Sequence, residues 1–200
     1  DRADNPQEGL SFIHVAGTNG KGSVSTLIAN ALIANGYRVG RYISPVICDY
    51  RERIQVNNRM ISKVAVAEGL SRLFELCNDM EKAGLSHPTA FEIETALGFQ
   101  YFKDKKCDYV VLETGMGGTL DATNIIKNTK LCVFTSVSMD HMAFLGNTPA
   151  EIASNKAGIL KTGCMAVSAP QSDEVMDVFK QACKTLEIPF TAVEENNIKV

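Results

Sequence analysis

Short apolar runs and longer amphipathic segments alternate along the whole chain. Continuous apolar runs are typical of strands buried on both faces, and the segments between them repeat apolar positions at helical spacing. We expect strands at about 12–16, 38–43, 109–112, 131–135, 165–169 and 190–192. Because strands that alternate with helices favour parallel pairing, the pattern predicts an α/β fold with a mostly parallel sheet flanked by helices.

Capping and turn residues mark the elements between these strands. We expect helices at about 21–35, 62–80, 89–103, 149–158 and 172–186. Ser62 and Thr148 are typical N-cap residues, and Pro149 suits the first position of a helix. The segment 54–61 alternates around a pair of asparagines, which tolerate positive φ, and this predicts a small hairpin.

Composition and charge narrow the class of protein. The chain has 200 residues, of which 45% are hydrophobic, and this suffices for one sizeable core. A formal net charge of −3 provides no basic field, so we expect no nucleic-acid partner. No apolar run reaches the ~18 residues of a membrane helix. Six scattered cysteines lack metal-like spacing and favour reduced thiols. We therefore expect a cytoplasmic monomer without a membrane partner. The chain starts at Asp1 rather than Met and could be a piece of a longer protein.

A glycine-rich segment joins the first predicted strand to the first predicted helix. Three glycines within 17–22 allow a tight turn whose backbone N–H groups approach an anion at the positive end of the helix. Lys21 adds a point charge and the Ser23 hydroxyl can bind Mg²⁺, so we expect a site for a nucleotide triphosphate. The strict pattern G-x-x-x-x-G-K-[ST] is not met, because Val15 replaces its first glycine and Gly22 separates lysine from serine. An ordinary glycine-rich turn is the alternative.

Polar residues follow two of the apolar strands. Glu113 comes directly after 109–112, and Asp140-His141 follows 131–135 in the same way. Since ligands of open parallel sheets bind at the carboxyl ends of the strands, we expect the Glu113 carboxylate beside the phosphate site, where it would bind Mg²⁺. A solvated glutamate and a structural histidine are the alternatives.

The segment Asn155-Lys156-Ala157-Gly158 is similar to a known nucleotide-binding signature. It resembles the N-K-x-D signature of guanine-binding GTPases, but Gly158 replaces the aspartate that would bind the guanine edge. The GTPase interpretation therefore fails. From the residues alone, the alternative is a lysine on the surface of a helix.

The segment 17–23, Gly-Thr-Asn-Gly-Lys-Gly-Ser, resembles the ATP loop of folylpolyglutamate synthases and dihydrofolate synthases. These are relatives of the Mur ligases, whose own loops usually end in Lys-Thr-Thr or Lys-Thr-Ser. Further segments resemble family motifs in the same order, at 44–45, 51–57, 88–96, 117–124, 138–148 and 152–161. The chain departs from these motifs at Val46, Thr119 and Asn155, where the family has histidine, arginine and glutamate. The resemblance covers about residues 5–161 and implies a P-loop fold like the Mur ligase central domain.

The resemblance also implies a site for ATP and two Mg²⁺ ions. The expected ATP contacts are Thr18, Asn19, Gly20, Lys21, Gly22 and Ser23. The expected metal ligands are Ser23, Ser44 and Glu113 for one ion, and Glu113, His141 and a carbamylated Lys156 for the other. The expected catalytic residues are Lys21, His141 and carbamylated Lys156, and the expected contacts to a pterin or folate are Phe91, Glu92 and Leu120.

The activity that the resemblance implies is ATP-dependent ligation of L-glutamate to folate or dihydropteroate through an acyl phosphate. The shared motifs do not separate these two acceptors. Residues 1–200 would then belong to an ATP-binding domain, with a C-terminal glutamate-ligase domain absent from this chain. One alternative is a Mur-type ligase acting on a cell-wall nucleotide, which Gly22-Ser23 and the segment 121–124 disfavour. The other is a nucleotide-binding fragment without activity.

Overall fold

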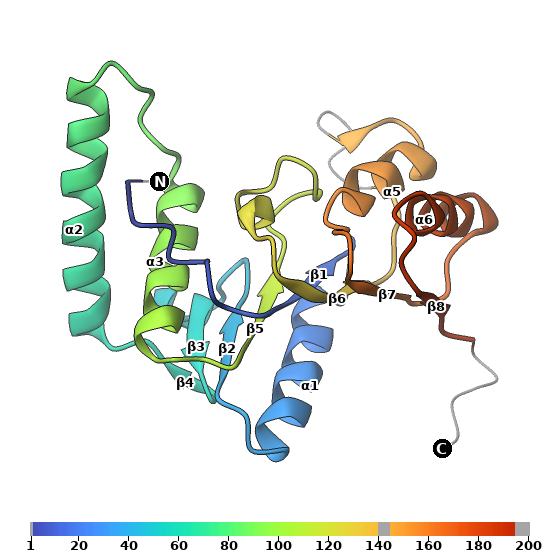
Figure 1. The fold of residues 1–200 in the computed structure, drawn as a ribbon, viewed down its shortest axis with the longest axis horizontal. Coiled ribbons are helices and arrows are strands. Elements are labelled where there is room, and N and C mark those ends of the chain that lie inside the picture. Colours follow the sequence, from blue (N-terminus) through green and yellow to red (C-terminus); the bar gives the residue numbers. More distant parts are fainter. Residues whose placement is uncertain (1, 140–144, 195–200) are drawn as a thin grey trace.

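The computed structural model describes residues 2–139 and 145–194, which form an eight-stranded sheet with helices on both faces (Figure 1). The strand order is β4-β3-β2-β5-β1-β6-β7-β8. The strands are β1 (Phe12–Ala16), β2 (Val39–Tyr42), β3 (Ile54–Val56), β4 (Arg59–Met60), β5 (Tyr109–Glu113), β6 (Thr129–Phe134), β7 (Met165–Ser168) and β8 (Phe190–Ala192). The pairs between β2, β5, β1, β6, β7 and β8 are parallel, whereas β3 and β4 pair antiparallel at one end. The predicted α/β class is therefore confirmed.

The helices also match the sequence prediction. They are α1 (Lys21–Ala34), α2 (Lys63–Lys82), α3 (Ala90–Asp104), α5 (Pro149–Ala157) and α6 (Asp173–Thr185), with short 3₁₀ helices η1 (Tyr50–Arg53) and η2 (Ala122–Ile125). The Ser62 hydroxyl caps α2 by accepting from the Ala65 N–H at 3.1 Å. The expected hairpin is the β3–β4 turn, where Asn57 and Asn58 have φ of 48° and 60°. The predicted caps and the predicted hairpin are thus confirmed.

The alternating side chains of β1 divide the core into two layers. Ile13 and Val15 pack with α1 on one face. Phe12 belongs to a cluster with α3 on the other face, and Ala16 belongs to the cluster under α5 and α6 on that same face. Figure 1 shows α1 on the opposite side of the sheet from α5 and α6. The central strand is therefore buried on both faces, as its continuous apolar run predicts.

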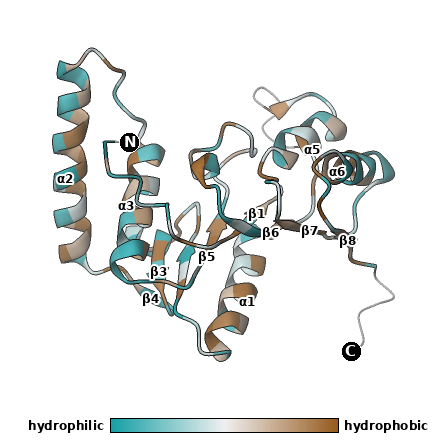
Figure 2. Cartoon of the chain, viewed as in Figure 1, coloured by the Kyte–Doolittle hydropathy of each residue, from teal (hydrophilic) through white to brown (hydrophobic). Residues whose placement is uncertain are grey.

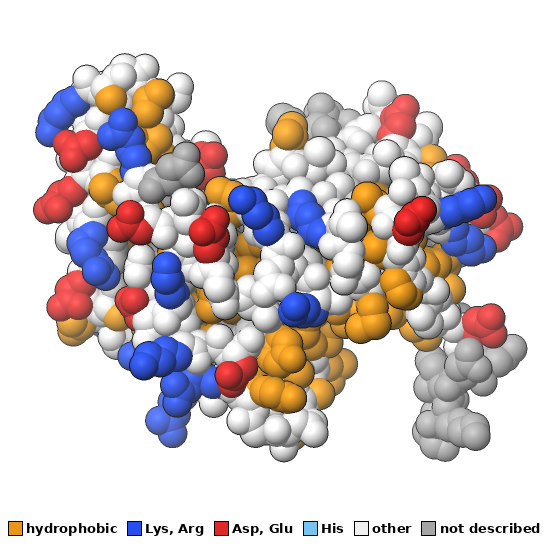
Figure 3. Space-filling view, viewed as in Figure 1, with side chains coloured by type: hydrophobic (Ala, Val, Ile, Leu, Met, Phe, Trp, Pro, Cys, Tyr) orange, Lys and Arg blue, Asp and Glu red, His pale blue; other side chains and the backbone are white. Residues whose placement is uncertain are grey.

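The outermost helix, α2, packs on α3. Figure 2 shows hydrophilic and hydrophobic residues mixed along α2, which is typical of a helix with one buried face. On the α1 side of the sheet, hydrophobic side chains gather at the surface in Figure 3. Leu27 of α1 is 69% exposed and Met165, which pairs with Leu131 in the sheet, is 55% exposed.

The described residues contain no helix long and apolar enough to span a bilayer. All six cysteines are free thiols, and five of them are buried while Cys48 is exposed. Those five thiols therefore serve as small apolar core residues.

The carboxyl ends of the central parallel strands meet along one edge of the sheet. The loops that leave this edge are 17–20 after β1, 43–49 after β2, 114–121 after β5 and 135–139 after β6. The backbone ties neighbouring loops together, because the Thr114 N–H donates to the Val15 carbonyl at 3.0 Å and the Thr18 N–H donates to the Ser136 carbonyl at 2.7 Å. This edge is the place where the sequence predicted the ligands to bind.

Candidate active site

The loop between β1 and α1 has the geometry of an anion site. Gly20 is the N-cap of α1 with φ 85°, and no side chain caps this helix end. The first N–H groups of α1 therefore remain available to a ligand at the positive end of the helix dipole. A Cβ at Gly17 would overlap the Thr135 hydroxyl, so this position requires glycine.

The ammonium group of Lys21 lies over this loop. Its Nζ donates to the carbonyls of Gly17 and Thr18 at 3.1 and 3.2 Å. Lys21 lines a cavity of about 260 Å³, named the phosphate cavity, together with Gly17, Thr18, Asn19, Ser44, Pro45, Gly115, Met116, Gly117 and Lys156. Five of the predicted site residues thus surround one space. Gly20, Gly22 and Ser23 adjoin it through the start of α1, and Ser23 is exposed.

Glu113 ends β5 beside the loop. The residue is 4% exposed, and its Oε2 atom has no hydrogen-bond partner among the described residues. A Cβ built at Gly22 would be 3.6 Å from this oxygen, so the carboxylate faces the start of α1. Burial raises the pKa of Glu113 to about 7, opposed by the charge of Lys21 and a hydrogen bond from the Ser44 backbone. A buried carboxylate oxygen without a protein partner, beside a phosphate loop, fits a hard cation such as Mg²⁺.

Lys156 of α5 reaches the same loop from the opposite side. Its side chain is 1% exposed, which excludes the alternative of a surface lysine. The Nζ donates to the Gly17 carbonyl at 3.0 Å, the oxygen that Lys21 also contacts. Two lysine side chains thus converge on one carbonyl oxygen at the edge of the phosphate cavity.

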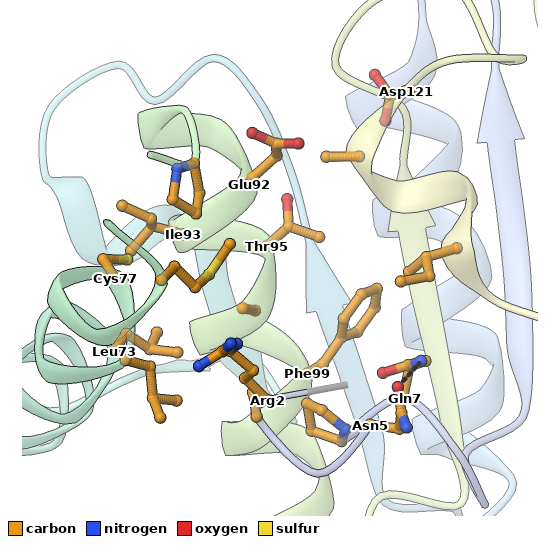
Figure 4. Close-up of a pocket in the computed structure, with 18 of the residues that line it drawn as sticks. Arg2, Asn5, Gln7, Leu73, Cys77, Glu92, Ile93, Thr95, Phe99 and Asp121 are labelled. Carbon is orange, nitrogen blue, oxygen red and sulfur yellow. Dashed lines mark hydrogen bonds between the residues drawn. The ribbon is translucent and has the colours of Figure 1, made fainter. Parts of the chain in front are cut away.

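Two further cavities continue from the phosphate cavity. The middle cavity, about 640 Å³, is lined by Ser44, Pro45, Arg53, Thr89, Phe91, Glu92, Gly115, Met116, Leu120, Asp121, Ala122, Leu145 and Asn155. The apolar cavity, about 430 Å³, lies between α2, α3, η2 and the N-terminal segment. Figure 4 shows Leu73, Cys77 and Phe99 around the apolar cavity, with Glu92 and Asp121 toward one end. The three predicted acceptor contacts, Phe91, Glu92 and Leu120, therefore line cavities beside the phosphate site.

The sequence is similar to those of known proteins over almost its whole length. The family model of the Mur ligase middle domain matches residues 15–197. A folylpolyglutamate synthase of Arabidopsis thaliana is 40% identical over 185 residues, which are 92% of this chain and 29% of the relative. A dihydrofolate synthase/folylpolyglutamate synthase of Bacillus subtilis is 38% identical over 195 residues, 97% of this chain and 45% of the relative.

The chain belongs to the folylpolyglutamate synthase family of the Mur ligases. An FPGS–AMPPCP–folate complex superposes with a TM-score of 0.93 at 34% identity, covering 97% of this chain and 47% of that one. The chain thus spans less than half the length of these relatives. The expected Mur ligase central-domain fold is confirmed.

Two residues that shape the site of this folylpolyglutamate synthase family member were not predicted from its sequence. Asp121 fixes the backbone of the loop after β5 and the start of η2. Its Oδ2 accepts from the Met116 N–H at 2.7 Å, and its Oδ1 accepts from the Thr123 N–H at 3.0 Å. The Asn155 Oδ1 accepts from the Gly118 N–H at 3.0 Å and so fixes the loop 114–121 on α5. Both were quoted within family motifs, but no role was predicted for them. The predicted ligand His141 lies outside the described residues.

Proposed function

We propose that this chain is the ATP-binding part of a ligase that joins L-glutamate to a folate or dihydropteroate carboxylate. The observation that carries the proposal is the continuity of the three cavities. The phosphate and middle cavities share Ser44, Pro45, Gly115 and Met116, and the middle and apolar cavities share Glu92, Leu120, Asp121 and Ala122. An acceptor lying along them would present its carboxylate to a bound triphosphate. The similar FPGS–AMPPCP–folate complex supports this pair of ligands.

The chemistry proceeds in two displacements. An acceptor carboxylate oxygen attacks the γ-phosphorus of ATP and ADP leaves, which gives an acyl phosphate. The amine of glutamate then attacks the acyl carbon, phosphate leaves, and the amine loses a proton. Phosphoryl transfer depends mainly on positioning and charge neutralisation. The start of α1 and Lys21 supply both, with ATP contacts from Thr18, Asn19, Gly20, Lys21, Gly22 and Ser23.

The proposed site at the sheet edge would hold two Mg²⁺ ions. Ser23, Ser44 and Glu113 would hold the first, and Glu113, His141 and carbamylated Lys156 would hold the second. When bound, Mg²⁺ neutralises charge on the phosphates and on the acceptor carboxylate. The unpartnered Glu113 Oε2 supports this assignment, because the described protein groups leave that oxygen without a hydrogen bond.

Carbamylation of Lys156 would remove one of the two positive charges that meet at the Gly17 carbonyl. The ammonium group first loses a proton, and the neutral amine then adds to CO₂ with loss of a second proton, so that a cation becomes an anion with two oxygen ligands. Two ammonium groups beside metal ions repel those ions, and unit charges ~4 Å apart interact by ~4 kcal/mol at an effective dielectric of 20. The burial of Lys156 and its contact with the carbonyl that Lys21 binds support this modification.

Of the proposed acceptor contacts, Phe91 and Leu120 would pack against the acceptor, and Glu92 would also hold the cavity wall in place. Phe91 would form one wall for the acceptor ring. Leu120 is 93% exposed, so a bound ring would cover it. The Glu92 carboxylate accepts from the Thr89 N–H at 2.7 Å and caps α3, so its contribution would be to hold this wall as well as to contact the pterin.

Glutamate binding would require more of the protein than this chain. The chain spans 29% to 47% of the three relatives described above, so residues 1–200 would be an incomplete ATP-binding domain and a C-terminal domain elsewhere in the protein would bind glutamate. The isolated chain would then be inactive. A cytoplasmic monomer remains the proposed state of the whole protein.

A product assay on the full-length protein tests the function. ATP, Mg²⁺ and glutamate are supplied with dihydropteroate, a reduced folate or a UDP-muramoyl peptide precursor, and ADP and the ligated product are measured. We expect product with at least one of the two pterin acceptors and none with the muramoyl precursor. Product with the muramoyl precursor alone would favour the cell-wall alternative, and ADP release without any ligated product would refute the ligase.

A further inference from the structure

Arg53 is a buried cation on the wall of the middle cavity. It ends η1 and is 9% exposed. The Ile43 N–H donates to its backbone carbonyl at 3.1 Å, which fixes Arg53 next to the Ser44-Pro45 turn. Since this turn is shared by the middle and phosphate cavities, Arg53 lies where an acceptor would approach the triphosphate.

The guanidinium group is held in place but incompletely paired. Its central carbon is 5.9 Å from the Tyr42 ring centroid and 5.8 Å from the Phe91 ring centroid, and Nε is 3.4 Å from an oxygen of Glu94. The Nε and Nη1 atoms are buried and have no hydrogen-bond partner among the described residues. Unsatisfied buried donors are costly, so this arrangement indicates that a partner supplies the acceptors.

Arg51, which also lies in η1, forms a structural ion pair with Asp49. Arg51 Nε donates to Asp49 Oδ1 at 3.0 Å and its Nη2 donates to Asp49 Oδ2 at 2.6 Å. This bidentate pair satisfies the guanidinium fork on the surface, away from the three cavities. Arg53, two residues further along, lines the middle cavity instead and has no such carboxylate pair among the described residues.

On the basis of the proposed ligase function, we propose that Arg53 binds the carboxylate of the acceptor and directs it toward the γ-phosphate. The acceptor carboxylate and the triphosphate are both anionic and repel each other on approach. Lys21 and Lys156 lie at the phosphate cavity, whereas Arg53 is the buried cation of the middle cavity among the described lining residues. A planar fork beside two aromatic rings that are themselves 6.1 Å apart suits an aromatic acid whose ring occupies the adjoining apolar cavity.

The test measures equilibrium binding of pteroate and of its carboxamide to the full-length protein without nucleotide. The two probes differ at the group that Arg53 would contact. The wild type should bind the carboxylate about 10- to 100-fold more tightly than the amide, the range expected for a charge-assisted hydrogen bond. Arg53→Gln should abolish this preference and leave the amide affinity nearly unchanged. The matched control Arg51→Gln should keep the wild-type preference.

Glu94→Gln provides a second variant that keeps Arg53. It removes the carboxylate that competes for the guanidinium and should increase the preference for pteroate. Unchanged preference in folded Arg53→Gln, or a preference unaltered or reduced in Glu94→Gln, would overturn the role of Arg53 while leaving the ligase proposal intact. Equal wild-type affinity for the two probes would also overturn it. Wild-type protein that binds neither probe would refute the proposed acceptor class itself.

Discussion

His14 should make the stability of this protein depend on pH through a single fully buried ring. Its Nε2 lies 2.9 Å from the Thr123 hydroxyl, and that hydroxyl donates its one proton to Asp121 Oδ1 at 2.5 Å. The hydroxyl oxygen must therefore accept from Nε2, which leaves Nδ1 unprotonated. Nδ1 is buried and has no hydrogen-bond partner among the described residues. Protonation of His14 would thus bury a new charge and an unsatisfied N–H.

The magnitude follows from the difference between the folded and unfolded states. Burial, with a smaller effect of the Lys161 charge, lowers the pKa of His14 from 6.5 to about 3. Between these values the unfolded chain binds a proton that the folded chain does not, so the free energy of unfolding falls as the pH falls. The loss is about 1.4 kcal/mol per pH unit below 6.5, or about 2 kcal/mol at pH 5. Above pH 6.5 His14 contributes no pH dependence.

Urea unfolding of the full-length protein between about pH 7.5 and about pH 4.5 measures this effect. Carboxylates also contribute to the wild-type slope, so the comparison with His14→Gln isolates the histidine. This variant should lose about 1.4 kcal/mol per pH unit of the slope below pH 6.5. His87→Gln is the matched control for the substitution, because His87 is exposed. Parallel curves for His14→Gln and wild type would refute the reasoning.

Three further predictions concern the phosphate cavity. Lys21→Ala should leave the fold intact but abolish the thermal stabilisation by Mg·ATP, which amounts to ~2.7 kcal/mol for wild type at ~100 times Kd; equal stabilisation would contradict a phosphate role. Glu113→Gln should reduce turnover in a Mg²⁺ titration more than His141→Ala, because the proposed site gives Glu113 a place on two ions and His141 a place on one. Near-normal turnover of Glu113→Gln would make this carboxylate a structural group. Lys156→Ala should lose activity and recover part of it with a small carboxylic acid. The wild type should lose activity in CO₂-depleted buffer and regain it with bicarbonate. Full activity of Lys156→Ala without additive would exclude the carbamate.

The fold could be predicted from local patterns because those patterns have local causes. The β1 run 12–16 is apolar at nearly every position because both of its faces are buried, and the asparagines at the β3–β4 turn adopt positive φ because few other residues do so at low cost. The hydroxyl of Ser62 caps α2 within three residues of its own position. Such signals lie within a few residues of each other, and a sequence displays them directly.

The site could be predicted only in part, because its decisive contacts are distant in the sequence. The Lys156 ammonium meets the Gly17 carbonyl across 139 positions, and no local pattern distinguishes this lysine from a surface residue. The family resemblance, not the periodicity, selected it. The N-terminal segment gave no signal at all, yet Asn5 and Gln7 line the apolar cavity in Figure 4. Arg53 likewise lay within a quoted motif without a predicted role.

Two of the departures from the family motifs, Thr119 and Asn155, meet in the structure. Asn155 Oδ1 accepts from the Gly118 N–H at 3.0 Å, and the Asn155 carbonyl accepts from the Thr119 N–H and hydroxyl, each at 3.0 Å. A Cβ at Gly118 would lie 2.7 Å from the Asn155 carbonyl oxygen, so the glycine allows this close approach. Lys156 lies on the same helix as Asn155. These neutral hydrogen bonds therefore fix the position of the loop 114–121 relative to the buried lysine at the phosphate cavity.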